Sequence, residues 1–567
     1  MQRIVRIRAG GLIVGLILMI AALGAVLISY FLSLDTSEVS VSPARTIANT
    51  DVNPYGANFF LEREVELYRR EETIKMAAEA GIGWAKQQFI WAQIEPQDVD
   101  FQDPANWQRS WGKYDDIVNL CERYGLQIIA RLDHPPAWTR QDNSILEAPP
   151  DDLTDYADFV YGFVKHYQGR VRYIQIWNEP NINPEWGNRE VDPAGYVEML
   201  KAACQATKSA DSNVYVLSAP LAPTLENFPL RRNLSELVFL EEMYQAGAAD
   251  YFDILSANAF GFDLPPEDPP SEDKLNFQRV KLQWEIMERH GDGHKAIWFN
   301  EYGWNASPAG AFTEEELTWK RVTEEQQAEY LLRGIELARR EWPWAGVFNV
   351  WFFRQVGHVS PDEPEYYFRM VDVNFTPRQV YYAVKDAAAG LRVAGAGYYE
   401  ETNPAVKDIQ DCRTVLDPSA SGGAYLACQH ADAGLSLTFS GKSVELITRR
   451  GPNGGRLIVT LDGRRVPGLP RDSRGRSYLD FYHSEMDRIS VKLVDEVGNG
   501  QHRLRLTVSD EMNEASSSSL CVVDAFEVQA IPPPVFPALP VVLLGIGMTL
   551  VSISLYREIT RNSWQRR

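Results

Sequence analysis

Residues 173–179 read YIQIWNE, a short apolar run that ends in the polar pair Asn178 and Glu179. Short apolar runs rich in β-branched and aromatic residues are typical of buried strands. Seven further runs of this kind occur between residues 53 and 353, and they are NPYGANFF (53–60), WAKQQFIW (84–91), LQIIARLD (126–133), VYVLSAP (214–220), FDILSANAF (252–260), AIWFNEY (296–302) and VFNVWFF (347–353). This part of the chain therefore predicts eight strands.

Helical patterns separate these runs. Residues 151–167 and 323–341, for example, carry apolar side chains at helical spacing. Strands that alternate with helices predict βαβ units and a parallel sheet, and eight such units are the number in a closed (β/α)8 TIM barrel. We predict this barrel over residues 50–392. An open, doubly wound sheet is the alternative, but it usually has a Gly-rich phosphate turn after its first strand, and residues 53–60 are not followed by one.

The second part of the chain has a different composition. Fourteen of the fifteen tryptophans lie between Trp84 and Trp351, and residues 352–563 contain none. Alternating apolar and polar runs, separated by turn signals such as GPNGG at 451–455, fill residues 395–530 and predict a jelly-roll-like β-sandwich. Cys412 and Cys428 lie within it, and whether they form a disulfide stays open because pairing cannot be deduced from sequence.

The two ends of the chain are apolar. Residues 10–33 and the second half of 531–556 are each long enough as helices to cross a hydrocarbon core of about 30 Å. A 34–49 linker follows the first segment. A cleaved signal peptide is the alternative for the first, although its apolar region exceeds the usual length of about 7–15 residues. A buried core helix is the alternative for the second.

Charge is distributed unevenly around these two segments. The chain has 56 basic and 77 acidic residues, a net charge of −21, while the tails 1–9 and 557–567 are basic. By the positive-inside rule, both tails are cytoplasmic and the large domain lies outside the cell membrane. Without the tails 49 basic and 76 acidic residues remain, so the exported part carries −27. This acidity argues against nucleic acid and other polyanions as partners.

Two glutamates mark a candidate site. Glu179 ends the fourth predicted strand and Glu301 ends the seventh. Enzymes built on this barrel place their catalytic residues at the C-terminal ends of strands. One strand-terminal glutamate is as readily a solvated residue, but a pair fits glycosidic bond cleavage, which uses one carboxylic acid and one carboxylate. The cysteines and histidines have no metal-ligand spacing, and we expect no metal or other cofactor.

Trp177-Asn178-Glu179-Pro180, together with the second glutamate at the end of strand seven, resembles the retaining glycoside hydrolases of clan A, particularly families 39 and 5. The resemblance covers about residues 50–390. It implies that Glu179 is the acid/base, Glu301 the nucleophile, and Asn178 the donor to the sugar 2-hydroxyl. It also implies cleavage of β-glycosidic bonds in an oligo- or polysaccharide substrate. Trp351 matches the aromatic residue that floors the subsite beside the scissile bond, with a core position as the alternative.

The chain departs from this family pattern at two places. Lys86 stands where arginine is usual, which keeps the charge but loses the bidentate fork. Asn258-Ala259-Phe260 stands where the family has His-x-Tyr, whose groups orient the nucleophile. Tyr302 and His134 are the candidates to compensate for the missing hydroxyl.

Further polar and aromatic residues follow the predicted strands. Arg131, Asp133 and His134 end the third strand and are candidate substrate contacts. Aromatic faces also stack on sugar rings, so three tryptophans near strand ends are candidate platforms, with core positions as the alternative. They are Trp138, Trp186 and Trp304.

The Trp-free part resembles the galactose-binding-like and other carbohydrate-binding sandwiches that are appended to such barrels. The resemblance rests on GPNGGRLIVTLDG (451–463), the turn at 500–502 and VDAFEV (523–528). Glycan binding and a packing role against the barrel both stay open for it.

Together these features predict a membrane-anchored, extracytoplasmic retaining β-glycosidase. One alternative is an inactive glycan-binding or envelope-scaffold protein whose barrel lost activity through the changes at Lys86, Asn258 and Phe260. The other is a transglycosylase that remodels exported polysaccharide.

Overall fold

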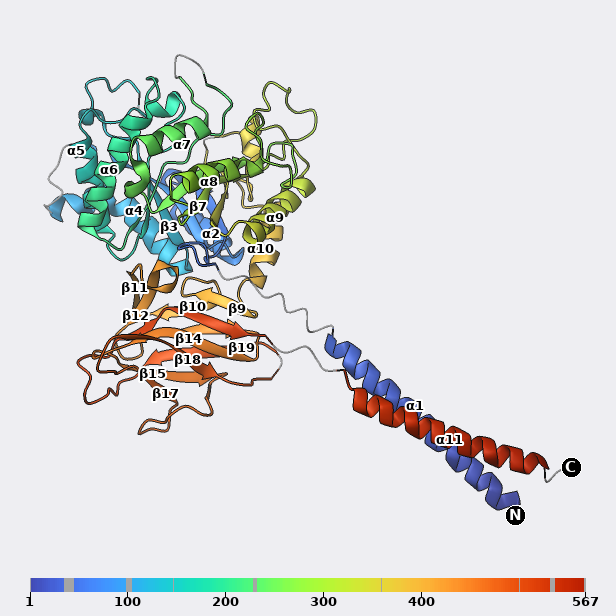
Figure 1. Ribbon diagram of the computed structural model, residues 1–567. Helices are drawn as coiled ribbons and strands as arrows, with labels where there is room; N and C mark the ends of the chain where they lie inside the picture. The colour runs from blue at the N-terminus through green and yellow to red at the C-terminus, as the bar shows by residue number, and fades with distance from the viewer. Residues whose placement is uncertain are drawn as a thin grey trace.

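The chain is seen in a computed structural model that describes residues 2–34, 45–97, 104–145, 147–227, 232–357, 359–498, 500–530 and 536–564. A barrel is followed by a β-sandwich that packs against one of its ends, and two long helices project away from both (Figure 1). The predicted fold class, a (β/α)8 barrel followed by a sandwich, is confirmed.

Eight parallel strands form the barrel and follow one another in chain order, with the first paired to the last. The strands are β1 (Tyr55–Phe59), β2 (Trp84–Ile90), β3 (Gln127–Asp133), β4 (Tyr173–Ile176), β5 (Tyr215–Leu217), β6 (Ile254–Phe260), β7 (Ala296–Gly303) and β8 (Ala345–Val350). Each overlaps one of the predicted runs. Because β8 ends at Val350, Trp351 belongs to the loop that follows it and not to a strand.

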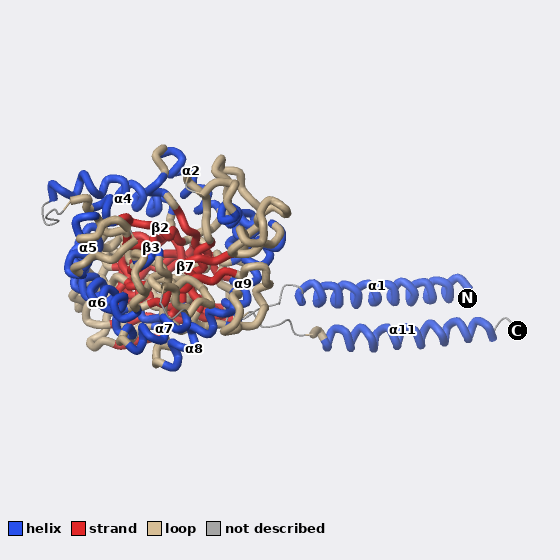
Figure 2. Tube along the Cα trace, turned by 90° about the horizontal axis from the view of Figure 1, so that it is seen from above, coloured by secondary structure: helices blue, strands red, loops and turns tan. Residues whose placement is uncertain are grey.

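Helices surround these strands (Figure 2). They are α2 (Leu67–Glu79), α3 (Trp91–Ile94), α4 (Pro104–Tyr124), α5 (Leu153–His166), α6 (Pro193–Ala210), α7 (Glu236–Gln245), α8 (Val280–Arg289), α9 (Glu324–Glu341) and α10 (Gln379–Gly390). The two segments predicted to be helical correspond to α5 and α9. A capping box between Thr323 and Gln326 begins α9, and it satisfies backbone N–H groups that have no partner inside the helix.

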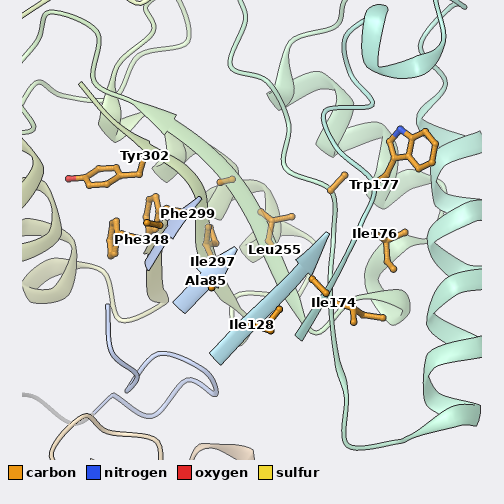
Figure 3. Packing of buried hydrophobic residues seen from close by; sticks show 14 of the residues in the cluster. Ala85, Ile128, Ile174, Ile176, Trp177, Leu255, Ile297, Phe299, Tyr302 and Phe348 are labelled. Carbon is orange, nitrogen blue, oxygen red and sulfur yellow. The ribbon is translucent and has the colours of Figure 1, made fainter. Parts of the chain in front are cut away.

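Apolar side chains pack between the barrel strands and the helices, and also inside the barrel at the N-terminal ends of its strands. Between strands and helices, Phe299 and Phe348 stack with their ring centroids 4.0 Å apart (Figure 3). Inside the barrel, at the N-terminal ends of its strands, Trp84 and Trp298 pack against Tyr173. Both tryptophans are therefore core residues, and aromatic rings occupy this end of the barrel interior.

The sandwich consists of short antiparallel strands. They are β9 (Gly397–Glu400), β10 (Val406–Gln410), β11 (Cys412–Leu416), β12 (Ala424–Cys428), β13 (Gly434–Phe439), β14 (Ser443–Arg450), β15 (Arg456–Leu461), β16 (Arg464–Arg465), β17 (Tyr478–Asp480), β18 (Asp487–Val494), β19 (His502–Val508), β20 (Cys521–Val523) and β21 (Ala525–Gln529). One sheet contains β10, β13, β19, β15, β16 and β17, and a second has the order β18-β14-β21-β9. Their inner faces share one hydrophobic core. A disulfide joins Cys412 to Cys428 across the β11–β12 pair.

The sandwich packs against the end of the barrel where its strands begin. The Asp51 carboxylate, just before β1, accepts hydrogen bonds from the Glu400 backbone N–H at 2.8 Å and from Asn403 Nδ2 at 2.9 Å. The Leu416 N–H donates to Asn213 Oδ1 at 3.3 Å, near the start of β5. The C-terminal ends of the strands face the opposite way, so the sandwich leaves that end of the barrel uncovered.

The first and last helices, α1 (Gln2–Leu34) and α11 (Ala538–Trp564), lie side by side and apart from the globular domains (Figures 1 and 2). They run antiparallel, so both chain ends lie at the far end of the pair (Figure 1). Within them, Gly11–Phe31 and Ala538–Arg561 are long and apolar enough to cross a membrane. Tyr30 packs edge-to-face on Phe536 with centroids 5.1 Å apart.

Candidate active site

Glu179 and Glu301 meet at the C-terminal end of the barrel, where Asn258 at the end of β6 lies between them. The Asn258 Nδ2 donates to Glu179 Oε1 at 2.5 Å and to Glu301 Oε2 at 3.4 Å. Because one nitrogen reaches both, these two oxygens are at most about 6 Å apart, the sum of the 2.5 and 3.4 Å contacts. The two glutamates that the sequence singled out therefore form a pair in space.

A β-bulge in β7 positions Asn300 and Glu301 at this site. Along β6 and β7, Ala257 pairs with Phe299 but Asn258 pairs with Glu301, so Asn300 is an extra residue on β7. Successive strand residues normally point to opposite faces, whereas a bulge re-aims a side chain beside an active site. Here the bulge lets Asn300 Nδ2 donate to Asn258 Oδ1 at 3.0 Å while the next residue, Glu301, accepts from the same amide.

The two glutamates differ in their electrostatic surroundings. Burial, and then the neighbouring Glu301 carboxyl, raise the pKa of Glu179 well above its usual range. Lys86 Nζ lies 3.6 Å from Glu301 Oε1 and gives this carboxylate a counter-charge. Lys86 is only 3% exposed, and burial lowers its pKa to about 8 although Glu301 opposes the shift. The arrangement thus favours a proton on Glu179 and a cation beside Glu301.

A cavity of about 260 Å³ opens beside this pair. Lys86, which contacts Glu301, is part of its wall, and so are the predicted site residues His134 and Trp351. The complete lining is Asn58, Phe59, Phe60, Arg63, Lys86, Gln88, Arg131, His134, Glu147, Glu185, Trp351, Gln355, Val359 and Glu365. Polar and charged side chains dominate this list, as expected of a site for a polar ligand.

The end of β3 contributes a polar network to the cavity wall. Asp133 accepts hydrogen bonds from Arg131 Nε and from Gln88 Nε2, and its Oδ1 lies 3.1 Å from His134 Nδ1. Although burial opposes both shifts, Arg131 holds the pKa of Asp133 below its usual range and Asp133 raises the pKa of His134. The sequence-predicted trio of Arg131, Asp133 and His134 is thus brought together.

The prediction that Tyr302 or His134 orients the nucleophile needs correction. The Tyr302 hydroxyl donates to the Leu331 carbonyl in α9, and its ring lies beside Phe299 and Phe348 in the core (Figure 3). Tyr302 follows Glu301 directly in β7, so their side chains leave opposite faces of the strand. His134 contacts Asp133 instead, and Asn258 occupies the position beside Glu301.

The tryptophan platforms predicted near strand ends are also corrected. Trp304 is fully buried and its Nε1 donates to the Leu264 carbonyl, while Trp186 is buried against Trp177. Trp138 is half-buried, donates to the Glu95 carbonyl and packs edge-on against Trp91. None of the three lines the cavity, because each ring fills space between loops and helices.

Trp351 and Asn178 do lie at the site. Trp351 is half-buried in the cavity wall with its ring edge-on to Phe60, so it is not a core residue. The Asn178 side chain is buried and hydrogen-bonds the Glu185 carboxylate. Its Oδ1 has no hydrogen-bond partner within the described residues.

Several site residues escaped prediction from sequence. Asn300 acts through the bulge, which the strand pattern does not reveal. Glu185 and Glu365 come from short 3-10 helices, Pro184–Trp186 and Pro364–Phe368, in the loops after β4 and β8. In the sequence Glu185 lies six residues after Glu179, and this proximity is the one signal that marks it as a candidate site residue. Among the described residues, no group of three or more His, Cys, Asp or Glu side chains could hold a metal ion.

No family model and no curated protein matches the chain. Similar solved structures include a family 39 glycoside hydrolase from Bacteroides cellulosilyticus WH2, with 16% identity, 82% of each chain covered and a TM-score of 0.44. A monomeric beta-xylosidase from Caulobacter crescentus CB15 has 13% identity, with 82% of this chain and 98% of that chain covered and a TM-score of 0.44. This similarity is distant, and the fold assignment rests on the strand order of the chain itself.

Proposed function

We propose that the chain is a retaining glycoside hydrolase that cleaves β-glycosidic bonds by double displacement. The observation that carries this proposal is the Asn258 amide, which reaches Glu179 and Glu301 at once and limits their oxygens to about 6 Å. Retaining enzymes have carboxyl groups about 5–5.5 Å apart, whereas inverting enzymes need about 6.5–9.5 Å to admit a water molecule. The short separation therefore supports a covalent intermediate.

The two carboxyl groups have different tasks in this reaction. In the first step the Glu301 carboxylate attacks the anomeric carbon, while Glu179 gives its proton to the departing glycosidic oxygen. In the second step the Glu179 carboxylate takes a proton from water, and the resulting hydroxide displaces Glu301 from the sugar. The raised pKa of Glu179 suits the first step, since burial and the Glu301 charge hold its proton. Once Glu301 is bonded to sugar its charge is gone, and Glu179 ionises more readily.

Asn258 and Lys86 support the pair. The Asn258 oxygen accepts from Asn300, so its amide hydrogens face the two glutamates. Lys86 places a cation 3.6 Å from the nucleophile. We propose that these two residues replace the groups that the family pattern leads one to expect at these positions.

Trapping of the covalent intermediate tests the proposal. A panel of 2-deoxy-2-fluoro glycosides with activated leaving groups should add one sugar to the protein, and peptide mass spectrometry should find it on Glu301. Glu301→Gln should take up no label. Labelling on another carboxylate, or binding of glycans by the wild-type protein without labelling by any sugar of the panel, would sink the double-displacement mechanism.

We further infer that α1 and α11 tether the barrel to a membrane. Their apolar surfaces are not covered by the rest of the molecule, and their antiparallel packing puts both chain ends on one side. The disulfide between Cys412 and Cys428 suits an oxidising compartment outside the cytoplasm. The substrate would then be a glycan near that membrane.

A further inference from the structure

The cations in the wall of the cavity all have acidic partners. Lys86 pairs with Glu301 at 3.6 Å, and Arg131 pairs with Asp133. The remaining two are Arg63, whose Nε lies 3.1 Å from Glu62 Oε1, and His134, which lies 3.1 Å from Asp133 and 3.9 Å from Glu147. Among the described residues of this wall, no positive charge is left over for an acidic ligand.

Two carboxyl groups in the same wall have no such partner. Within the described ranges, neither Glu185 nor Glu365 has a lysine, arginine or histidine nitrogen within 4.0 Å. Glu185 is hydrogen-bonded by the Asn178 side chain, and Glu365 by the Trp351 indole. Both neighbours are neutral. Arg131 acts on Glu185 and Arg63 on Glu365 only at longer range, and each of these cations already pairs with another carboxylate, so the cavity has a surplus of acid.

The two groups approach the cavity from opposite sides. Glu185 lies after β4 and Glu365 after β8, and these strands are four positions apart in a closed barrel of eight. Both are half-buried, and a half-buried carboxylate that forms no ion pair is costly. Burial raises the pKa of Glu365 to about 7 and also raises that of Glu185. A cation in the cavity would relieve this cost at both ends.

We propose that the substrate is a cationic glycan, built of hexosamine units with free amino groups, and that Glu185 and Glu365 bind its ammonium groups. This inference rests on the proposed glycosidase function, because the cavity that the two residues line lies beside Glu301, with Lys86 in its wall. An ammonium group offers three N–H donors and a full charge, so it serves carboxylates on separate loops. A metal ion would need three or more ligands together, and the described side chains offer no such group.

The net charge of the whole chain also favours a cationic ligand. At −21, the protein attracts a polycationic glycan and repels an acidic one. This attraction raises the association rate of such a glycan. The two carboxyl groups determine which sugar binds.

Matched oligosaccharides test the proposal. Hexamers of glucosamine with β-1,3, β-1,4 and β-1,6 linkages are compared with their N-acetylated forms by calorimetry at pH 6.5, using the full chain in detergent with Glu179→Gln to prevent turnover. Within at least one linkage, the free amine should bind at least about tenfold more tightly, since each charge-assisted contact is worth about 1.5–3 kcal/mol. Added salt should reduce this preference.

Variants connect the preference to the two residues. Glu185→Gln and Glu365→Gln, each in the same Glu179→Gln background, should each lower the preference for the amine about fivefold or more. Glu314→Gln, at a site 84% exposed in the loop after β7, is the control and should leave it unchanged. Equal binding of amine and acetylated forms for every linkage, or a preference that survives both cavity variants, would overturn the proposal.

Labelling and binding measured together distinguish a wrong substrate from a wrong mechanism. Fluorosugar labelling of Glu301 combined with equal binding of both hexamers would reject the cationic substrate and leave the hydrolase intact. Amine-selective binding without any covalent labelling would reject double displacement and support a cationic glycan ligand.

Discussion

At the scale of single residues, Asn258 is the group on which the geometry of the site depends. Asn300 donates to its oxygen at 3.0 Å, and this contact determines which end of the amide faces the glutamates. The amide then donates to both Glu179 and Glu301. An asparagine can serve two carboxyl groups in this way because it has two N–H donors on one nitrogen.

The two glutamates should respond differently to removal of their charge. Glu179→Gln should lower kcat/KM by about 10²–10⁴-fold, because the leaving group is no longer protonated, and azide should restore part of the second step. Glu301→Gln should abolish the covalent intermediate. Steady-state kinetics with and without azide, together with mass spectrometry, measure both effects. Equal residual activity of the two variants, with no azide effect on either, would reject the assignment of roles.

Lys86 should make activity fall in alkaline solution. Its pKa is lowered by burial to about 8, so the ammonium beside Glu301 is present below that pH and is lost as the pH rises through it. We expect kcat/KM to fall about tenfold for each pH unit above about 8. In Lys86→Arg the fall should move to higher pH, because arginine stays protonated. An unchanged alkaline limit in this variant would show that another group titrates there.

At the scale of elements, the contact between β9 and the loop before β1 determines how the sandwich meets the barrel. Glu400 on β9 is 3% exposed, and its Oε1 accepts from Ser421 Oγ at 2.7 Å. Burial raises the pKa of Glu400 to about 8, with the Ser421 hydrogen bond opposing. Burial also raises the pKa of Asp51 and raises that of Asp524 to about 6. Burial therefore favours the protonated form of all three carboxyl groups.

Because of this interface, the free energy of unfolding should fall as the pH of the solution rises. A carboxyl group with a raised pKa in the folded state binds its proton more tightly there than in the unfolded chain. For Glu400 the stabilisation is complete below about pH 4.5, the unfolded value, and is lost as the pH rises through about 8. Glu400→Gln should flatten this dependence and raise the Tm at pH 8 by on the order of 5 °C.

Calorimetry of the wild type and of Glu400→Gln between pH 5 and 8 measures the effect. Glu527→Gln, an exposed glutamate on the adjacent strand β21, is the control and should follow the wild type. Parallel curves for wild type and Glu400→Gln would show that Glu400 does not link pH to stability.

At the scale of the whole molecule, the sandwich and the cavity lie at opposite ends of the barrel. The sandwich covers the end where the strands begin, and the cavity opens at the other end. The helix pair of α1 and α11 lies apart from both domains, with both chain ends at its far tip (Figure 1). The sandwich therefore does not block access to Glu179 and Glu301 from the C-terminal end of the barrel.

This arrangement predicts the topology of the chain in the membrane. In right-side-out cells, a membrane-impermeant maleimide should label a cysteine placed at the exposed Glu314, but should not label one placed after Met1 or at the C-terminus. Permeabilisation should expose both ends equally. Labelling of either end in intact cells would contradict a hairpin with both tails in the cytoplasm.

Some properties of this protein follow from sequence alone because they depend on local patterns. The eight apolar runs predict the barrel strands, and Glu179 and Glu301 stand out because strand ends are recognisable one at a time. The orientation of the other side chains depends on the tertiary structure. The position of Tyr302 one residue after Glu301 puts its ring in the core, while the bulge at Asn300 adds a residue to the site. Glu185 and Glu365 line one cavity only after the sheet has closed, since separation along the chain says nothing of the distance between opposite strands.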